Sequence, residues 1–204
     1  MNRKLGFYSA ALVGITTLLF AISMLIGSSS LAYFVCMILS WGYILLTCAF
    51  YTETIDDRKS VALGGVAFGC LYGVLINIVY FTQLTTVAHK TASANALQVL
   101  SYQSLGSLFF NFDLFGYGMM ALSTFLIGVS MIAKNKNDKW LKALLMIHGI
   151  FLISCVALPI LNVFKDSGGG SSFAGTLALL VWCIYFIPAA ILSAVHFRKA
   201  MNAG

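Results

Sequence analysis

The chain has 204 residues, of which 60% are hydrophobic and 9% charged, with a mean hydropathy of +0.94 and a net charge of +6. A soluble domain carries about 25% charged residues, so this composition excludes a soluble globular protein and predicts a polytopic membrane protein. The positive charge does not indicate nucleic-acid binding, because the basic residues form short clusters between apolar runs rather than one patch.

Several apolar stretches are long enough to cross a bilayer, which takes about 20 residues. The first, from Leu5 to Ile26, exceeds the apolar core of a signal peptide, about 7–15 residues, so we expect a spanning helix there. In chain order, the predicted spans are 5–26, 31–52, 60–82, 113–133, 141–163 and 174–197. We therefore expect an all-α bundle that forms one six-helix transmembrane domain over residues 1–204.

The lysines and arginines predict the orientation of this bundle. An even number of spans puts both termini on one side, which then holds ten of the twelve basic residues; Lys90 and Lys165 lie on the other side. Because cytoplasmic loops are enriched in Lys and Arg, we expect both termini in the cytoplasm and the protein in a plasma membrane.

The segment 83–112, between the third and fourth spans, is too polar to span and too apolar for a free loop. Ser93 is a suitable helix cap, and the apolar residues after it fall on one stripe. These residues are Leu97, Leu100, Leu105, Leu108, Phe109 and Phe112. We predict one interfacial amphipathic helix here, lying on lipid or folded over the outer mouth of the bundle.

Glycines recur every four residues on the third span, at Gly65, Gly69 and Gly73, and Asn77 follows at the same spacing. Small residues at this spacing let two membrane helices approach closely, so we interpret the three glycines as a helix-packing stripe. The alternative is the wall of a path for a solute. Asn77 then faces a neighbouring helix, because a lone carboxamide in hydrocarbon would leave its polar groups unpaired.

A shift of 107 residues aligns ITTLLFAISM (15–24) with LSTFLIGVSM (122–131), and WGYILLTC (41–48) with HGIFLISC (148–155). If the match reflects a repeat, the two halves hold three spans each and are inverted relative to one another. Inverted repeats of this kind are common in transporters, which bind their solute between the halves.

Two ionisable residues complete a candidate polar site with Asn77. Asp113 lies at the outer end of the fourth span. One interpretation is a polar anchor that binds a solute or pairs with a cation such as Lys90. The other is a helix N-cap. His148 lies inside the fifth span with Cys155 seven residues on, on the same face. We expect no metal site, since too few ligands converge.

Motifs for catalysis are missing from the sequence. It contains no HExxH, P-loop or dinucleotide fingerprint, and no serine has a histidine that spacing places beside it. We therefore expect neither an enzyme nor a cofactor.

The stretches YFTQLTTV (80–87) and FDLFGYGMMALSTFLIG (112–128) resemble segments of uncharacterised small six-helix bacterial integral membrane proteins. The resemblance covers most of the chain. It implies a bacterial plasma-membrane protein of one domain, and it implies no activity and no catalytic residues.

Two functional hypotheses follow from the sequence. The first is a non-catalytic membrane partner or accessory protein, which is favoured by the packing stripe and by the lack of charge in mid-membrane. The alternative is a small-solute transporter built from two inverted three-helix halves. The partners expected are thus the lipid bilayer and either another membrane protein or a small solute, with no nucleic acid.

Overall fold

The computed structural model describes residues 1–164 and 171–202, with side chains described except at 171–174. The described residues form helices and no strand, and six helical stretches among them are long and apolar enough to cross a membrane. The predicted helical membrane bundle is confirmed. Its spans are α1 (Asn2–Leu25), α2 (Ser29–Glu53), α3 (Lys59–Thr82), α5 (Leu108–Ser130), α6 (Lys136–His148) with α7 (Phe151–Ile160), and α8 (Ser171–Asn202).

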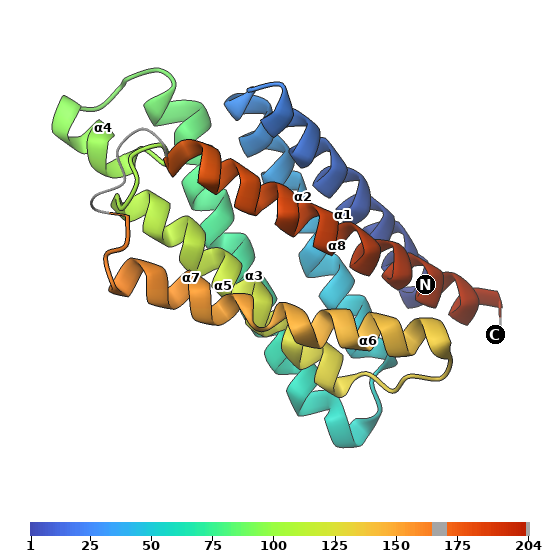
Figure 1. The fold of residues 1–204 in the computed structure, drawn as a ribbon. Coiled ribbons are helices and arrows are strands. Elements are labelled where there is room, and N and C mark those ends of the chain that lie inside the picture. The colour runs from blue at the N-terminus through green and yellow to red at the C-terminus, as the bar shows by residue number, and fades with distance from the viewer. Residues whose placement is uncertain (165–170, 203–204) are drawn as a thin grey trace.

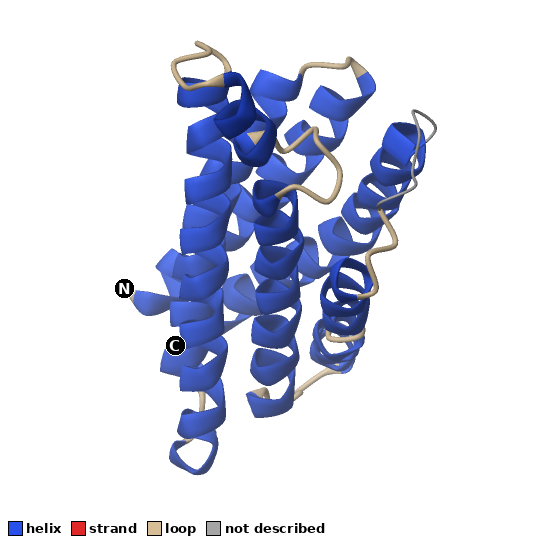
Figure 2. Cartoon of the chain, turned by 90° about the vertical axis from the view of Figure 1, so that its left-hand side faces the viewer, coloured by secondary structure: helices blue, strands red, loops and turns tan. Residues whose placement is uncertain are grey.

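The spans pack side by side in a bundle, as Figures 1 and 2 show, and their contacts run in a ring in which α6 joins the fifth span to α8. The order around the ring is α1, α2, α3, α5, α6 with α7, and α8, and α8 returns to contact α1. Both termini lie at one end of this ring, which we call the terminal end (Figure 1). The other end carries the short helix α4 (Ala94–Leu100) and is called the opposite end.

Local hydrogen bonds set where the helices begin and end. Ser107 and Asn135 cap the first turns of α5 and α6 through side-chain oxygens that accept backbone N–H bonds. At the last turn of α5, Lys142 Nζ donates to the carbonyl of Met131 at 2.9 Å, and Arg58 Nη1 donates to a carbonyl of the same turn at 3.3 Å. Cations stabilise a helix at this end, because its last carbonyls lack partners.

The fifth span is broken, although the sequence predicted a continuous helix over 141–163. α6 ends at His148 and α7 begins at Phe151, so Gly149 and Ile150 form a turn within the span. A Cβ on Gly149 would lie 2.9 Å from the Cβ of Phe125, so glycine lets α5 pack closely against this turn. The turn lies between His148 and Cys155, and both residues approach α5: His148 bonds Thr124, and Cys155 lies against Gly118.

The predicted interfacial helix is shorter than expected. It is α4, which begins after the Ser93 cap and ends at Leu100 with no buried residue. The chain then turns, and α5 begins at Leu108. Consequently Leu105 lies in a turn, and three more residues of the expected stripe belong to the fourth span: Leu108, Phe109 and Phe112. Stripe spacing alone could not reveal that Ser107 caps a new helix.

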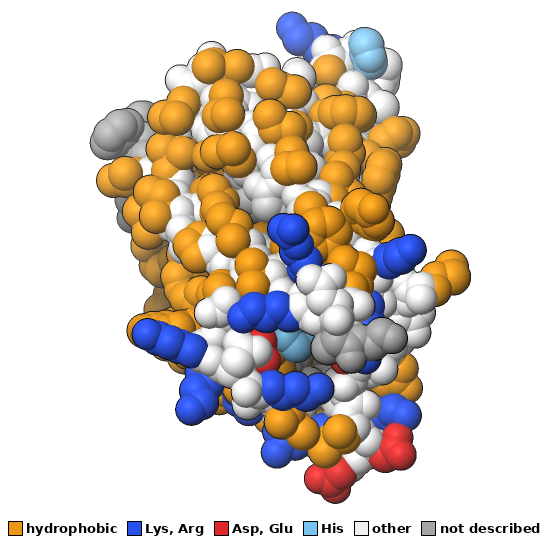
Figure 3. Space-filling view, turned by 90° about the vertical axis from the view of Figure 1, so that its right-hand side faces the viewer, with side chains coloured by type: hydrophobic (Ala, Val, Ile, Leu, Met, Phe, Trp, Pro, Cys, Tyr) orange, Lys and Arg blue, Asp and Glu red, His pale blue; other side chains and the backbone are white. Residues whose placement is uncertain are grey.

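Charged side chains gather at the terminal end, where Figure 3 shows a belt of lysines and arginines around a hollow that contains a histidine. Exposed apolar side chains cover the flanks of the bundle above this belt (Figure 3). This distribution fits a membrane-embedded protein, because apolar side chains on every flank face a hydrocarbon solvent favourably.

Candidate functional site

A cavity of about 730 Å³ lies at the opposite end of the ring. Residues of α1, α2, α3, α5 and α8 line it together with the segment that joins α4 to α5. The described lining residues offer aromatic, hydroxyl and amide groups but no Lys, Arg, His, Asp or Glu. Ligand pockets measure roughly 300–1,000 Å³, so the cavity has the size of a small-molecule site.

Three tyrosines form one wall of this cavity, and we call them the tyrosine cluster: Tyr33 on α2, Tyr80 on α3 and Tyr102 before α5. Tyr33 and Tyr80 stack with their ring centroids 5.2 Å apart. Tyr102 meets both rings edge-on, at 5.8 Å and 6.0 Å. Loss of water contact, and then the nearby Asp113 carboxyl, raise the pKa of Tyr102, so its hydroxyl remains neutral at neutral pH.

Gln83 fixes the position of Tyr102. It is 4% exposed and lies in the π-helical turn Gln83–Val87 that extends α3. Its Nε2 donates to the carbonyl of Leu100 at 2.8 Å, and its Oε1 accepts from the backbone N–H of Tyr102 at 2.9 Å. Both the amide nitrogen and the amide oxygen of this buried side chain are thus hydrogen-bonded, and the two bonds hold the end of α4 over the ring.

Asp113 lies beneath the tyrosine cluster and is 2% exposed. It follows the lining residue Phe110 by three positions, which places it about 4.5 Å deeper along α5. The side chain of Tyr80 lies close to its carboxyl group. Its Oδ1 has no hydrogen-bond partner among the described residues, and the hydroxyl of Tyr72 is a second buried orphan.

Two expectations for Asp113 change with the structure. Ser107 caps α5, so the interpretation of Asp113 as an N-cap is wrong. The predicted pairing with Lys90 is also wrong, since Lys90 is exposed and the ion pairs among the described residues do not include Asp113. Asp113 is therefore a buried carboxyl without a basic partner in the described part of the chain.

Side chains fill the middle of the ring below Asp113. Tyr43 and Tyr72 meet edge-on with ring centroids 5.4 Å apart, and the Tyr43 hydroxyl donates to Ser123 Oγ at 2.8 Å. A space of only about 20 Å³ remains beside Tyr43, between α2, α5 and α8. One water needs roughly 10–15 Å³ by this measure, so the cavity does not continue through the middle of the ring.

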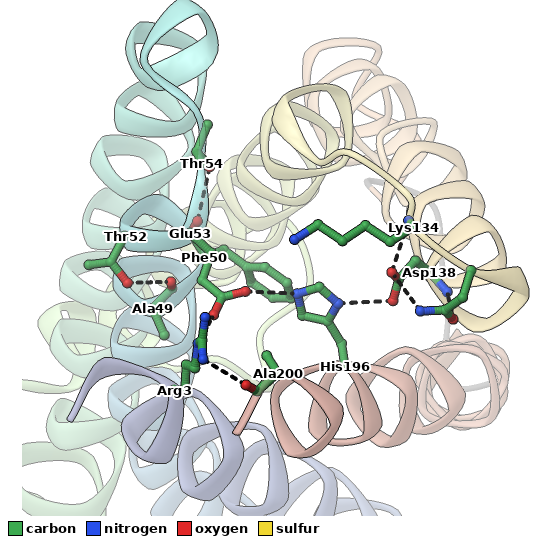
Figure 4. Close-up of polar contacts among 11 residues, drawn as sticks. Arg3, Ala49, Phe50, Thr52, Glu53, Thr54, Lys134, Asp138, His196 and Ala200 are labelled. Carbon is green, nitrogen blue, oxygen red and sulfur yellow. Dashed lines mark hydrogen bonds and ion pairs between the residues drawn. The ribbon is translucent and has the colours of Figure 1, made fainter. Parts of the chain in front are cut away.

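A charged network joins four spans at the terminal end (Figure 4). Arg3 on α1 donates from Nε to Glu53 Oε1 on α2 at 3.1 Å, and from Nη1 to the carbonyl of Ala200 on α8 at 2.7 Å. His196 on α8 lies between two carboxylates: Nε2 is 3.3 Å from Glu53 Oε2, and Nδ1 is 2.9 Å from Asp138 Oδ1 on α6.

Asp138 is the carboxylate more closely bound to His196 in this network, since its Oδ1 forms a hydrogen bond with His196 Nδ1. Asp138 is 2% exposed and also accepts from the backbone N–H of Lys134 at 3.0 Å and from Asn135 Nδ2 at 2.9 Å. A cleft of about 540 Å³ opens beside the network, and Lys134 extends its side chain across it (Figure 4).

His148 belongs to a separate hydrogen-bonded chain. Trp182 Nε1 donates to His148 Nε2 at 2.9 Å, so Nδ1 carries the proton and donates to Thr124 Oγ1 at 2.7 Å. Thr124 in turn donates to the backbone carbonyls of its own helix. Every polar atom of this 1%-exposed imidazole is thus satisfied, and the histidine links α5, α6 and α8.

Asn77 joins α3 to α2, away from the cavity lining. Its Nδ2 donates to Ser40 Oγ and to the carbonyl of Gly73, each at 2.7 Å, and its Oδ1 accepts from Trp41 Nε1 at 2.9 Å. The carboxamide therefore bonds a neighbouring helix, as an interhelical polar residue does in a membrane.

The three glycines of α3 lie against two different neighbours. A Cβ on Gly65 would be 2.8 Å from Ile127 Cδ1 and 3.2 Å from the carbonyl oxygen of Ser123, both on α5. A Cβ on Gly73 would be 2.5 Å from Ile44 Cδ1 on α2. Gly69 lies between these contacts, so the stripe lets α3 pack against both α2 and α5.

The structure does not bring Asn77, Asp113 and His148 into one site. Sequence reasoning also missed the tyrosine cluster and the charged network. The signal that could have singled out Glu53, Asp138 and His196 is that each lies at the same end of a different span. The sequence does not say which of these ends are neighbours in the ring.

Comparison with known proteins identifies a family but no activity. No curated protein and no solved structure matches the chain. A family model described as "Domain of unknown function (DUF4386)" matches residues 27–189, which is most of the chain and includes α2 to α7 in full. The chain is a member of the DUF4386 family.

Proposed function

We propose that this protein is a small-solute transporter that takes its solute into the cavity at the opposite end. The observation that carries the proposal is the cavity itself, about 730 Å³ at the end of the ring and separated from the terminal end by packed side chains. A binding space reached from one face only is what alternating access requires in one of its two states.

The order of the helices supports two inverted halves. The first half is α1 to α3, and the second is α5, the broken span α6 with α7, and α8. Contacts between halves are made by α3 with α5 and by α8 with α1. The predicted repeat pairs α1 with α5 and α3 with α8. Exchanging the two halves would therefore turn the contact of α3 with α5 into the contact of α8 with α1. The break after His148 lies in the second half, and broken spans are common near transporter sites.

In this proposal the charged network closes the terminal end. It joins α1 and α2 of the first half to α6 and α8 of the second, so it must rearrange before the cavity could face that end. The basic residues around it support a cytoplasmic location for the terminal end, because Lys and Arg are enriched on the cytoplasmic side of membrane proteins. The role is binding and translocation, without catalysis.

Distance measurements by electron paramagnetic resonance test the proposal without a known solute. Spin labels on Asp57→Cys after α2 and Lys139→Cys on α6, in a cysteine-free background and in nanodiscs, report the separation of the two halves at the terminal end. Both native residues are exposed. We expect two distance populations, with the longer one increased by Glu53→Gln, which removes a charge from the network.

Asp56→Asn is the matched control, because Asp56 lies nearby and pairs with Lys59 outside the network. It should leave the ratio of the two populations unchanged. A single narrow distance population that is the same in the parent protein and in Glu53→Gln would contradict transport by alternating access.

A second function, that of a membrane partner or accessory protein, is favoured by the surface of the fifth span. Of the most apolar 18 residues of the span Lys136–Ile160, 11% are buried inside the bundle. The corresponding share for the span Leu108–Ser130 is 61%. A photo-crosslinking residue at Ile153, which is 69% exposed, should then capture one specific protein in native membranes. The same probe at Ile15 on α1, which is 58% exposed, is the control. Capture of lipid alone at Ile153 would exclude this second function.

A further inference from the structure

We propose that the solute is an organic cation, an amine or quaternary ammonium with an apolar substituent, whose charged group lies on the tyrosine cluster above Asp113. The inference rests on the proposed function and assigns the chemical class of its solute. It is drawn from three features at the cavity: the aromatic side chains, the sign of the charge near them among the described residues, and a buried carboxyl oxygen without a hydrogen-bond partner in that part of the chain.

The aromatic faces are suited to a cation. Tyr33, Tyr80 and Tyr102 come from three different segments, contact one another and all line the cavity. The face of an aromatic ring carries negative potential and attracts ammonium groups, and several rings together form the aromatic cages that bind quaternary ammonium ligands. An anion would be repelled by the same faces.

Among the described residues, the charged group close to the tyrosine cluster has the sign that a cation needs. The described lining residues include no basic group, and the carboxyl of Asp113 lies behind Tyr80 within the ring. A carboxylate held in a membrane interior is costly unless a positive charge pairs with it. An organic cation that enters the cavity supplies that positive charge, whereas an anion would add a second negative charge.

An unpaired polar atom lies beneath the site. Asp113 Oδ1 is buried and has no hydrogen-bond partner among the described residues. Buried polar atoms in proteins are nearly always paired, so this carboxyl oxygen indicates a place near which a polar or charged group of a ligand is received. The apolar part of the solute then packs on the lining residues Phe20, Phe110 and Leu179.

The test compares three phenyl compounds of different charge with the full chain in nanodiscs: phenyltrimethylammonium, benzenesulfonate and phenyl glucoside. Isothermal titration calorimetry should show saturable binding of phenyltrimethylammonium, at least about tenfold tighter than of the other two. Ser29→Trp, which narrows the cavity, should abolish this binding. Ser30→Trp, at the next residue and outside the lining, should preserve it.

Substitutions of Asp113 and Tyr33 test whether these residues bind the charged group of the ligand. Asp113→Asn should weaken phenyltrimethylammonium binding by at least about tenfold, because the buried negative charge is lost. Tyr33→Phe keeps the aromatic face and should bind within about twofold of the parent, whereas Tyr33→Leu should bind about five- to thirtyfold more weakly. The Tyr33 pair provides a test even where Asp113→Asn fails to fold, and Asp57→Asn on the exposed surface serves as the charge control.

Distinct outcomes overturn the inference and the function on which it rests. Equal affinity for all three compounds, or unchanged binding of phenyltrimethylammonium by both Asp113→Asn and Tyr33→Leu, overturns the cation. Binding of benzenesulfonate or phenyl glucoside that Ser29→Trp abolishes, without binding of the cation, also overturns the cation and leaves the transporter standing. A single distance population in the resonance experiment overturns the transporter even where the cation binds.

Discussion

His196 on α8 and Asp138 on α6 lie 2.9 Å apart, Nδ1 to Oδ1, at the terminal end of the ring. The two residues are 58 positions apart in sequence. Glu53 approaches the other nitrogen of the same imidazole from α2, at 3.3 Å. One histidine near the end of α8 thus connects this helix to its neighbour α6 and, across the ring, to α2, at the end that carries both termini.

The Asp138→Asn variant should be less stable than the parent protein. Asp138 is 2% exposed and accepts three hydrogen bonds, and the substituted amide cannot accept at both former oxygens. Loss of bonds to a charged, buried acceptor costs about 1–3 kcal/mol. Thermal unfolding in detergent should show a lower midpoint. Asp57→Asn, at an exposed position, is the control, and an Asp138→Asn midpoint equal to that of the control would refute the prediction.

The Gly65→Ala variant tests the contact between α3 and α5. The added methyl group would lie 2.8 Å from Ile127 Cδ1 and 3.2 Å from a backbone oxygen, so the helices must shift apart. Overpacking of this kind costs about 1–3 kcal/mol. Gly175→Ala on α8 is the matched control, since nothing lies within 4 Å of its added methyl group. Equal unfolding midpoints for the two variants would show that α3 and α5 are not in close contact at Gly65.

The tautomer of His148 is a direct consequence of its neighbours. Trp182 has only a donor, so His148 Nε2 must accept and Nδ1 must carry the proton. Nitrogen-15 NMR of the labelled protein should report the neutral Nδ1–H form. Trp182→Phe removes the donor and should reduce stability by about 1–2 kcal/mol. A spectrum of the Nε2–H tautomer in the parent protein would contradict this hydrogen-bonded chain.

The sequence predicted the number and positions of the spans well, because long apolar runs separated by charged residues leave little choice in a bilayer. Span boundaries shifted by a few residues where caps decide them, as Ser107 does for α5. The break at Gly149 could not be predicted, because that residue lies in an uninterrupted apolar run and its effect depends on the approach of Phe125 from another helix.

The candidate site was harder to predict, because it depends on which helices are neighbours. Asp113 was singled out as an ionisable residue near a span, but it is buried and lies close to Tyr80 on α3, 33 positions earlier, which one sequence does not place beside it. Tyrosines near span ends resemble an ordinary interfacial belt. Only the closed ring shows that Tyr33, Tyr80 and Tyr102 face one another rather than lipid.

Cysteine accessibility tests most directly the central claim that a solute-sized cavity opens at the opposite end and stops in the middle of the ring. Ala32 is 6% exposed and lines the cavity, and Ala49, on the same helix, is 1% exposed and packs in the core. Each alanine is replaced by cysteine in a cysteine-free background, and a membrane-impermeant methanethiosulfonate is added to one side of sealed vesicles at a time. The account predicts that Ala32→Cys reacts only from the side opposite the termini and that Ala49→Cys reacts from neither. An Ala32→Cys thiol that is unreactive from both sides, or that reacts from the terminal side, would contradict it.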